Sequence, residues 1–255
     1  DGPGAGPALA DRVGVTIVGP VYADAPATRD CLESLAADTV SQTRSRIVVV
    51  DDASPDAMIR ALLDRLAAQG RITLLRNPHN VGFIRAVNRA LRLVRMEDVV
   101  LLNADTSVPP GWLDRLRAAA CTAPDIGTVT PLSNNGELVS LPVPFRSNPM
   151  PEPARLAEID AAAARIGGGL VDMPNGVGFC LYVRNDALRA VGSLDATRYE
   201  RGYLEEVDFC LRVAAAGYRN VCATTVFVGH RRAASLAGRQ RAPVRSHTAP
   251  TPPPR

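Results

Sequence analysis

Residues 99–108 read VVLLNADTSV, and this stretch decides how the first half of the chain folds. Four apolar residues, Val99 to Leu102, predict a buried strand that ends at Asn103 and Asp105. Residues two apart in an extended chain face the same way, so both side chains can address one ion or one ribose. Such oxygen donors suit Mg²⁺ or Mn²⁺, although capping of the following loop explains the same pattern.

Upstream of this stretch, apolar runs alternate with segments of helical spacing. The sequence predicts strands over 13–20, 45–54, 71–77 and 97–105, and helices over 27–38, 55–70 and 80–94. This alternation is typical of an α/β protein, and we expect one mostly parallel central sheet flanked by helices.

Downstream of residue 125 the regular alternation of predicted strands and helices ends. Residues 126–144 look loop-rich, and the remaining predicted elements are a helix over 152–169, a strand over 176–186, a helix over 203–218 and a last strand or strand pair over 221–235.

Two predicted strands upstream also end in polar residues, at Asp51-Asp52 and at Arg76-Asn77. In open α/β sheets ligands bind beyond the carboxyl ends of the strands. Adjacent carboxylates are costly unless a cation or a hydrogen-bond donor lies near them. Asp52 could accept the imide N–H of uracil or thymine, and a turn with a helix cap is the structural alternative.

Chemistry-bearing residues also occur late in the chain. Residues 204–212, LEEVDFCLR, place Glu205, Glu206 and Asp208 at the start of a predicted helix. The helix dipole favours acids there, but a carboxylate on such a rigid element also suits a general base. His230 ends an apolar run, and a neutral imidazole beside Asp105 would complete a metal site, although a structural role explains a lone His equally.

Composition excludes several classes of function. All 29 basic residues are Arg, so no mechanism can use a catalytic Lys, and neither a GxGxxG after the first strand nor a GxxxxGK[ST] motif occurs. The net charge of +3 and the absence of interleaved basic and aromatic residues argue against nucleic-acid binding. The five cysteines form no CxxC pair and no run of about 18 apolar residues occurs, which favours a reducing, cytoplasmic setting. The basic residues at the end of the chain add the expectation of a location at the inner face of a membrane.

The two ends of the chain differ from its middle. Residues 1–12 read as a linker, 13–236 as one domain with halves at 13–125 and 126–236, and 237–255 as a basic, Pro-rich tail. Residues 231–255 carry six Arg and no acid, so peripheral membrane contact through this tail is one expectation and a solvated tail is the other. The domain could belong to a longer protein.

Eight segments, in this order, resemble family 2 glycosyltransferases with a GT-A fold, in which a Rossmann-like N-terminal half precedes an acceptor-binding half. They are VTIVGPVY, IVVVDDAS, LLRNPHNVGFIRAVNRAL, VVLLNADTSVPPGWLDRL, GTVTPLSNN, NGVGFCLYVRNDAL, LEEVDFCLRVAAAGY and VGH.

The resemblance implies a set of functional residues. It gives the nucleotide-binding role to Pro20, Tyr22, Asp52, Arg76, Asn80, Gly82, Asn103 and Ala104. It gives a divalent metal, Mn²⁺ or Mg²⁺, to Asp105 and His230, with Asn103 in place of the family's usual Asp. The catalytic base would be Glu206, supported by Glu205 and Asp208, and the sugar and acceptor would meet Asn134, Asn135, Asn175 and Gly176.

The activity implied is inverting transfer of a sugar from a UDP- or dTDP-sugar donor to a hydroxyl of a glycan or lipid-linked acceptor. Bacterial polysaccharide biosynthesis is the setting that the resemblance implies. Three alternatives remain open at this point: a degenerate, non-catalytic GT-A module that binds a nucleotide or a partner, a sugar nucleotidyltransferase, and a glycoside hydrolase.

Overall fold

The apolar runs of the N-terminal half form four adjacent parallel strands. They are β1 (Val15–Val21), β2 (Ser45–Asp51), β3 (Thr73–Arg76) and β4 (Asp98–Leu102), in the spatial order β3-β2-β1-β4. Alternate side chains enter two different cores, Ile17 one and Val18 the other. A strand buried on both faces needs a continuous apolar run, which explains the composition of these segments. The computed structural model describes residues 14–37, 45–166, 168–199 and 204–231.

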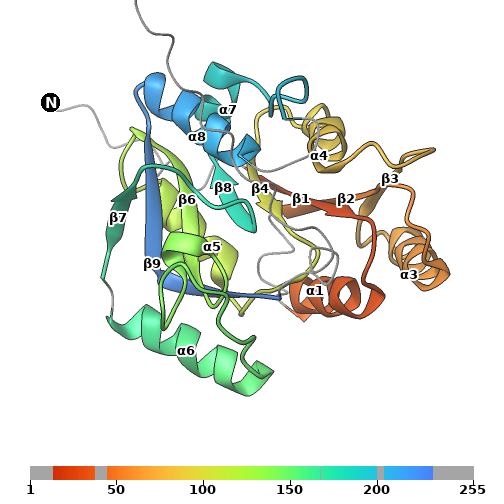
Figure 1. Cartoon of the computed structure of the whole chain (residues 1–255), viewed down its shortest axis with the longest axis horizontal. Coiled ribbons are helices and arrows are strands. Elements are labelled where there is room, and N and C mark those ends of the chain that lie inside the picture. Colours follow the sequence, from red (N-terminus) through yellow and green to blue (C-terminus); the bar gives the residue numbers. More distant parts are fainter. Residues whose placement is uncertain (1–13, 38–44, 167, 200–203, 232–255) are drawn as a thin grey trace, which may run out of the picture.

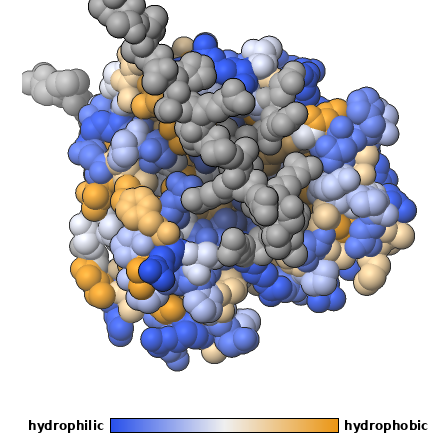
Figure 2. Space-filling model, in the orientation of Figure 1, coloured by the Kyte–Doolittle hydropathy of each residue, from blue (hydrophilic) through white to orange (hydrophobic). Residues whose placement is uncertain are grey.

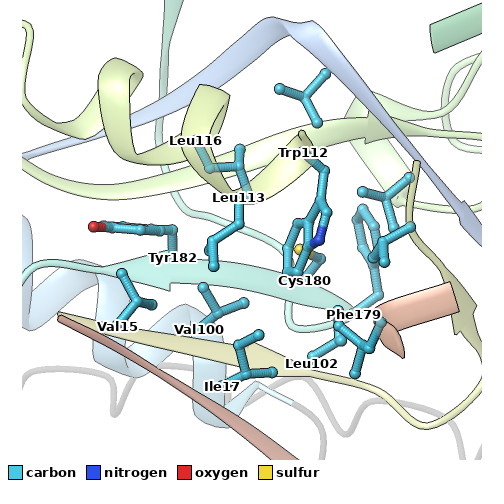
Figure 3. Close-up of a cluster of buried hydrophobic side chains, with 14 of the residues drawn as sticks. Val15, Ile17, Val100, Leu102, Trp112, Leu113, Leu116, Phe179, Cys180 and Tyr182 are labelled. Carbon is cyan, nitrogen blue, oxygen red and sulfur yellow. The ribbon is translucent and has the colours of Figure 1, made fainter. Parts of the chain in front are cut away.

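Helices cover both faces of the sheet, which gives three layers (Figure 1). Helices α1 (Ala25–Ala37), α3 (Ala57–Ala68) and α5 (Trp112–Ala120) place buried residues in one core. Helices α4 (Phe83–Leu91), α7 (Asn185–Val191) and α8 (Glu205–Ala215) place theirs in the other. In Figure 3, Trp112, Leu113 and Leu116 reach from α5 toward β4 and β8 (Cys180–Val183).

The C-terminal half continues the same sheet with mixed pairing. Strand β8 runs antiparallel to β4 and to β6 (Ile126–Ser133), while β9 (Arg219–His230) runs parallel to β6. Strands β7 (Leu170–Met173) and β5 (Thr106–Ser107) both pair antiparallel with β9. The expected mostly parallel pairing therefore holds without a break from β3 to β4, and the rest of the sheet is mixed.

The prediction of a loop-rich segment over 126–144 was wrong for its first eight residues, which form β6. Pro131 is unusual in this position, because proline removes a ladder hydrogen bond and is usually excluded from a central strand. Here the register against β9 shifts between Pro131 and Leu132, and a strand tolerates proline at such an irregularity. A short 3-10 helix, η2 (Glu137–Val139), follows this strand.

The other predicted elements are present with shifted or shorter bounds. The helix predicted over 152–169 is α6 (Pro153–Ile166), which packs on β9, and the strand predicted over 176–186 shrinks to β8. The predicted linker and basic tail lie outside the described residues. Within the described part no helix is long and apolar enough to span a membrane. All five cysteines are unpaired thiols, and four of them are buried.

Candidate active site

A cavity of about 780 Å³ opens at the carboxyl ends of β1, β2 and β4. It contains eight of the residues that the sequence singled out: Pro20, Tyr22, Asp52, Asn80, Gly82, Asn103, Ala104 and Asp105. The remaining lining residues are Val21, Ala23, Asp24, Ala27, Phe83 and Ala86. The lining therefore joins apolar side chains with three carboxylates, which are suited to bind a cation or the hydrogen-bond donors of a ligand.

The adjacent carboxylates Asp51 and Asp52 point to different partners. Asp51 accepts hydrogen bonds from the Ser54 amide (2.8 Å) and from Nε of Arg76 (3.1 Å). Arg76 also donates to Asp64 (2.8 Å), and it is not among the residues that line the cavity. The structure therefore removes Arg76 from the predicted nucleotide pocket, because the cation is held by Asp51 and Asp64 beside α3.

Asp52 is 4% exposed and is held by the loop after β3. Its Oδ1 accepts from the Asn77 side-chain amide (2.7 Å) and the Val81 amide (2.9 Å), while Oδ2 accepts from the Gly82 amide (2.9 Å). Gly82 has a φ of 85°, a backbone conformation that favours glycine, and this turn directs its amide at Asp52. An ionised carboxylate has about four acceptor positions, so one position on Oδ2 stays open.

A two-residue ladder brings together Asp105 and His230, which are far apart in the sequence. Thr106 and Ser107 of β5 pair with His230 and Gly229 of β9, and the Arg231 amide donates to the Asp105 carbonyl (2.9 Å). In this register Nε2 of His230 lies 3.4 Å from Oδ1 of Asp105.

The His230 ring is fixed in one tautomer. Its Nδ1 meets the backbone carbonyl of Asn135, and a carbonyl can only accept, so Nδ1 carries the proton. In the neutral ring Nε2 carries the lone pair, and it faces Asp105. The Phe179 ring stacks on the imidazole at 5.1 Å between centroids. A histidine whose second nitrogen is held by a backbone carbonyl is prepared as a metal ligand.

Asn134 and Asn135 belong to the support of His230 rather than to a substrate surface. The buried Asn134 side chain donates to the His230 carbonyl (2.9 Å) and accepts from the His230 amide (2.8 Å). The backbone of Asn135 holds the ring. The predicted sugar and acceptor role does not fit the Asn134 side chain, because its hydrogen bonds are used within the protein.

Asn175 and Gly176 also differ from the prediction. The Asn175 side chain bonds to the carbonyl of Gly176 (2.8 Å). A Cβ on Gly176 would approach Leu181 to 2.4 Å, so this glycine faces the packed core and not a ligand. Its small size serves the close approach of the chain to β8.

Glu206 lies at the start of α8 against the backbone of Gly178, where a Cβ would contact its side chain at 3.6 Å. Burial is the main reason that the pKa of Glu206 rises to about 7, and the charges of Glu205 and Glu137 raise it further. The side chain is thus half ionised near neutral pH, the range in which a general base works best.

The other two acids of α8 have different surroundings. Glu205 is 8% exposed, its Oε2 has no hydrogen-bond partner, and burial raises its pKa. Asp208 instead pairs with Arg212 (2.9 Å) and Arg198 (3.7 Å). Glu205 can therefore act on Glu206 through its charge, whereas Asp208 is engaged in ion pairs.

Gly178 and Phe179 join the two parts of the site, and the sequence analysis did not single out either as a link. Gly178 touches Glu206, while the Phe179 ring stacks on His230 and its carbonyl accepts from the Asn103 amide (2.9 Å). Asp24 and Phe83 of the cavity were also missed. The amphipathic pattern of residues 80–94 explains Phe83 as a helix face, and nothing local indicates that it borders a ligand.

The residues at Asp105 and His230 fit a hard divalent cation. One carboxylate oxygen and one imidazole nitrogen, each on a mostly buried side chain, face one another across 3.4 Å. Mg²⁺ and Mn²⁺ commonly keep water and phosphate oxygens in the remaining positions, so two protein ligands suffice. In the described part of the chain no three His, Cys, Asp or Glu side chains form a fuller metal cluster.

Comparisons with known proteins place the chain. The family model described as glycosyl transferase family 2 matches residues 16–189, more than half of the 255 residues. A search of curated protein sequences gave no match.

Three solved structures share the fold. A mannosyltransferase from Pyrobaculum calidifontis, in complex with GDP-Man and Mn²⁺, is 21% identical with a TM-score of 0.60, covering 85% of this chain and 56% of its own. GalNAc-T7 with UDP, GalNAc and Mn²⁺ is 16% identical with a TM-score of 0.66, covering 86% and 44%. S. aureus TarS (1–349) is 16% identical with a TM-score of 0.59, covering 84% and 60%. The chain thus spans about half of the length of these proteins.

Proposed function

The chain belongs to glycosyl transferase family 2, and from this membership we propose that it transfers a sugar from a nucleoside-diphosphate donor to a hydroxyl of a glycan or lipid-linked acceptor. The observation that carries the proposal is the β5–β9 ladder, which sets Asp105 and a tautomer-fixed His230 beside the cavity. Asp52 supplies a carboxylate that can bind the base of the nucleotide, and Glu206 supplies a general base for the acceptor hydroxyl.

Asp52 favours a donor with uracil or thymine. Both of these bases present one imide N–H, and Asp52 has one acceptor position left on Oδ2. Guanine presents two adjacent donors and pairs best with two free carboxylate oxygens. The base preference thus follows from the loop of residues 77–82, which already occupies Oδ1.

Asp105 and His230 would hold Mn²⁺ or Mg²⁺. The metal would neutralise the charge that develops on the leaving diphosphate. The structures of the mannosyltransferase and of GalNAc-T7 contain Mn²⁺, which supports this assignment. Asn103, which replaces the family's usual Asp, lines the same cavity as a neutral oxygen donor.

Glu206 acts as the general base in the proposed reaction. It takes the proton of the acceptor hydroxyl while that oxygen attacks the sugar C1, and the C1–O bond to the diphosphate breaks. A single displacement of this kind inverts the anomeric centre. Burial keeps the carboxylate poorly solvated and its pKa near 7, which makes it a stronger base than an exposed Glu.

We place the reaction in the cytoplasm, at the inner face of the membrane, in the assembly of a bacterial polysaccharide. The unpaired thiols, of which four are buried, support a reducing compartment. The degenerate-module alternative predicts nucleotide binding without turnover, so release of nucleoside diphosphate in the presence of acceptor separates the two functions.

Calorimetric titration of UDP, dTDP, GDP and CDP, with and without Mn²⁺, tests the proposal. We expect UDP or dTDP to bind more tightly than GDP, and Mn²⁺ to tighten binding about tenfold or more, which equals about 1.4 kcal/mol. Asp105→Asn should remove the metal effect, while Asp64→Asn, an exposed carboxylate on α3, should leave it intact. Binding of none of the four nucleotides under either condition would refute the proposed function.

A further inference from the structure

The loop between η2 and α6 carries an unbroken exposed apolar segment. Residues 141–147 are all exposed, and 141–145 read LPVPF. Phe145 is 74% exposed, and Leu138, Leu141 and Val143 are exposed as well. Four of the eleven exposed large hydrophobic residues in the described chain thus fall within eight positions. Clustering of this kind marks an interaction surface, whereas single exposed apolar residues do not.

Hydrogen bonds hold this loop in place. The Asn148 side-chain amide donates to the carbonyls of Val143 (3.0 Å) and Asn134 (3.1 Å). The Phe145 amide donates to the Glu137 carbonyl (2.7 Å). The apolar side chains are therefore presented by an ordered backbone, which lowers the entropy cost of binding.

The same loop borders the catalytic groups. Asn134, which anchors Asn148, also binds the backbone of His230. The charge of Glu137, at the start of the loop, contributes to the raised pKa of Glu206. The loop therefore adjoins both the support of His230 and the surroundings of Glu206.

We propose that the exposed side chains of Leu138, Leu141, Val143 and Phe145 insert into the surface of a lipid bilayer and hold the acceptor side of the site against it. This inference rests on the proposed function, since it names the surface that supplies the acceptor. No charged residue lies between Glu137 and Arg146, and the exposed Arg146 follows the apolar segment directly, where a guanidinium can reach lipid phosphates.

The shape of the loop favours a bilayer over a protein partner. The four side chains line neither the nucleotide cavity nor the smaller cavity of about 540 Å³ between α1 and α6. A stable protein interface needs about 800 Å² on each partner, far more than one short loop offers. On the face drawn in Figure 2 the described surface is mostly hydrophilic, with small and separate hydrophobic groups. A bilayer accepts single protruding apolar side chains without a complementary pocket.

Flotation of the full chain with phosphatidylcholine/phosphatidylglycerol vesicles in about 1 M NaCl tests the insertion. High salt screens contacts of the Arg-rich residues 231–255, whereas burial of apolar surface persists. We expect Leu141→Ser combined with Phe145→Asn to lower partitioning at least tenfold. Asn tolerates the positive φ of 59° at position 145. Ile166→Ser, which removes an even more exposed apolar side chain at the end of α6, should change partitioning less than twofold.

A second measurement locates the contact. Trp112 is the one tryptophan of the chain and is fully buried, so the emission added by Phe145→Trp reports on the loop alone. We expect a blue shift with vesicles and quenching by brominated lipid. Flotation without a change in this emission, equal flotation of the double variant, or no flotation would each overturn the inference. UDP binding measured without vesicles tests the proposed function separately.

Discussion

Glu206→Gln should abolish transfer and at the same time stabilise the protein at alkaline pH. Glu206 is partly buried, and this burial raises its pKa from 4.5 to about 7. The folded protein therefore prefers the protonated side chain, and ionising it costs stability as the pH rises from 4.5 through 7. Gln carries no charge and nearly the same shape, so it avoids this cost.

The size of the effect follows from the pKa. A rise of about 2.5 pKa units, at 1.36 kcal/mol each, sets an upper limit of about 3 kcal/mol at pH 8. Partial access of solvent reduces this figure, and we expect the variant to be more stable by about 1–3 kcal/mol at pH 8. At pH 5, where Glu206 is protonated in the folded state, the difference should fall below about 1 kcal/mol.

Urea unfolding of the wild type and of Glu206→Gln at pH 5 and pH 8 measures the change in stability. A transfer assay on the same two proteins measures the loss of activity. Loss of the general base should lower kcat by about 10²–10⁴. Glu158→Gln, which removes an exposed carboxylate of α6, serves as the control and should change stability by less than about 0.5 kcal/mol at either pH. If Glu206→Gln gains no stability between pH 5 and pH 8, or retains transfer, the assignment of a buried base is refuted.

Three further outcomes follow from the same site. The kcat of the wild type should rise about tenfold from pH 6 to pH 8, with a midpoint near the Glu206 pKa of about 7. Glu205→Gln should move that midpoint to lower pH, and an unchanged profile would exclude the charge of Glu205 as a cause of the raised pKa. His230→Gln should leave UDP binding weak and insensitive to Mn²⁺ in calorimetry, and equal Mn²⁺ dependence would show that the metal lies elsewhere. Asn134→Ala should weaken the apparent Mn²⁺ affinity about 10–100-fold while circular dichroism stays native, because the backbone of His230 loses two bonds; unchanged affinity would count against its positioning role.

The fold was largely predictable because β1 and β4, the central strands of the N-terminal half, are buried on both faces. A continuous apolar run such as Val99 to Leu102 has few alternatives to a central strand, and its polar end then falls at the binding edge. Strand β6 was missed because its Thr and Pro residues depend on neighbours from the far end of the chain. Local pattern cannot supply those neighbours.

The candidate site was predictable where family motifs carry it and not where tertiary contacts decide. The sequence could not show that Asp51 pairs with Arg76 while Asp52 faces the cavity, because the two carboxylates are adjacent at the end of β2. Nor could the sequence show that the Asn134 side chain bonds to the backbone of His230. These assignments depend on side-chain direction after folding, which spacing alone does not determine.

The ladder between β5 and β9 also determines when the site can form during synthesis of the chain. Asp105 emerges from the ribosome about 125 residues before His230. During synthesis the first half can form its parallel strands, but the metal pair stays incomplete until the last described strand arrives. A chain interrupted before β9 thus lacks the histidine of the proposed metal site, and catalytic competence is withheld until β9 has been synthesised.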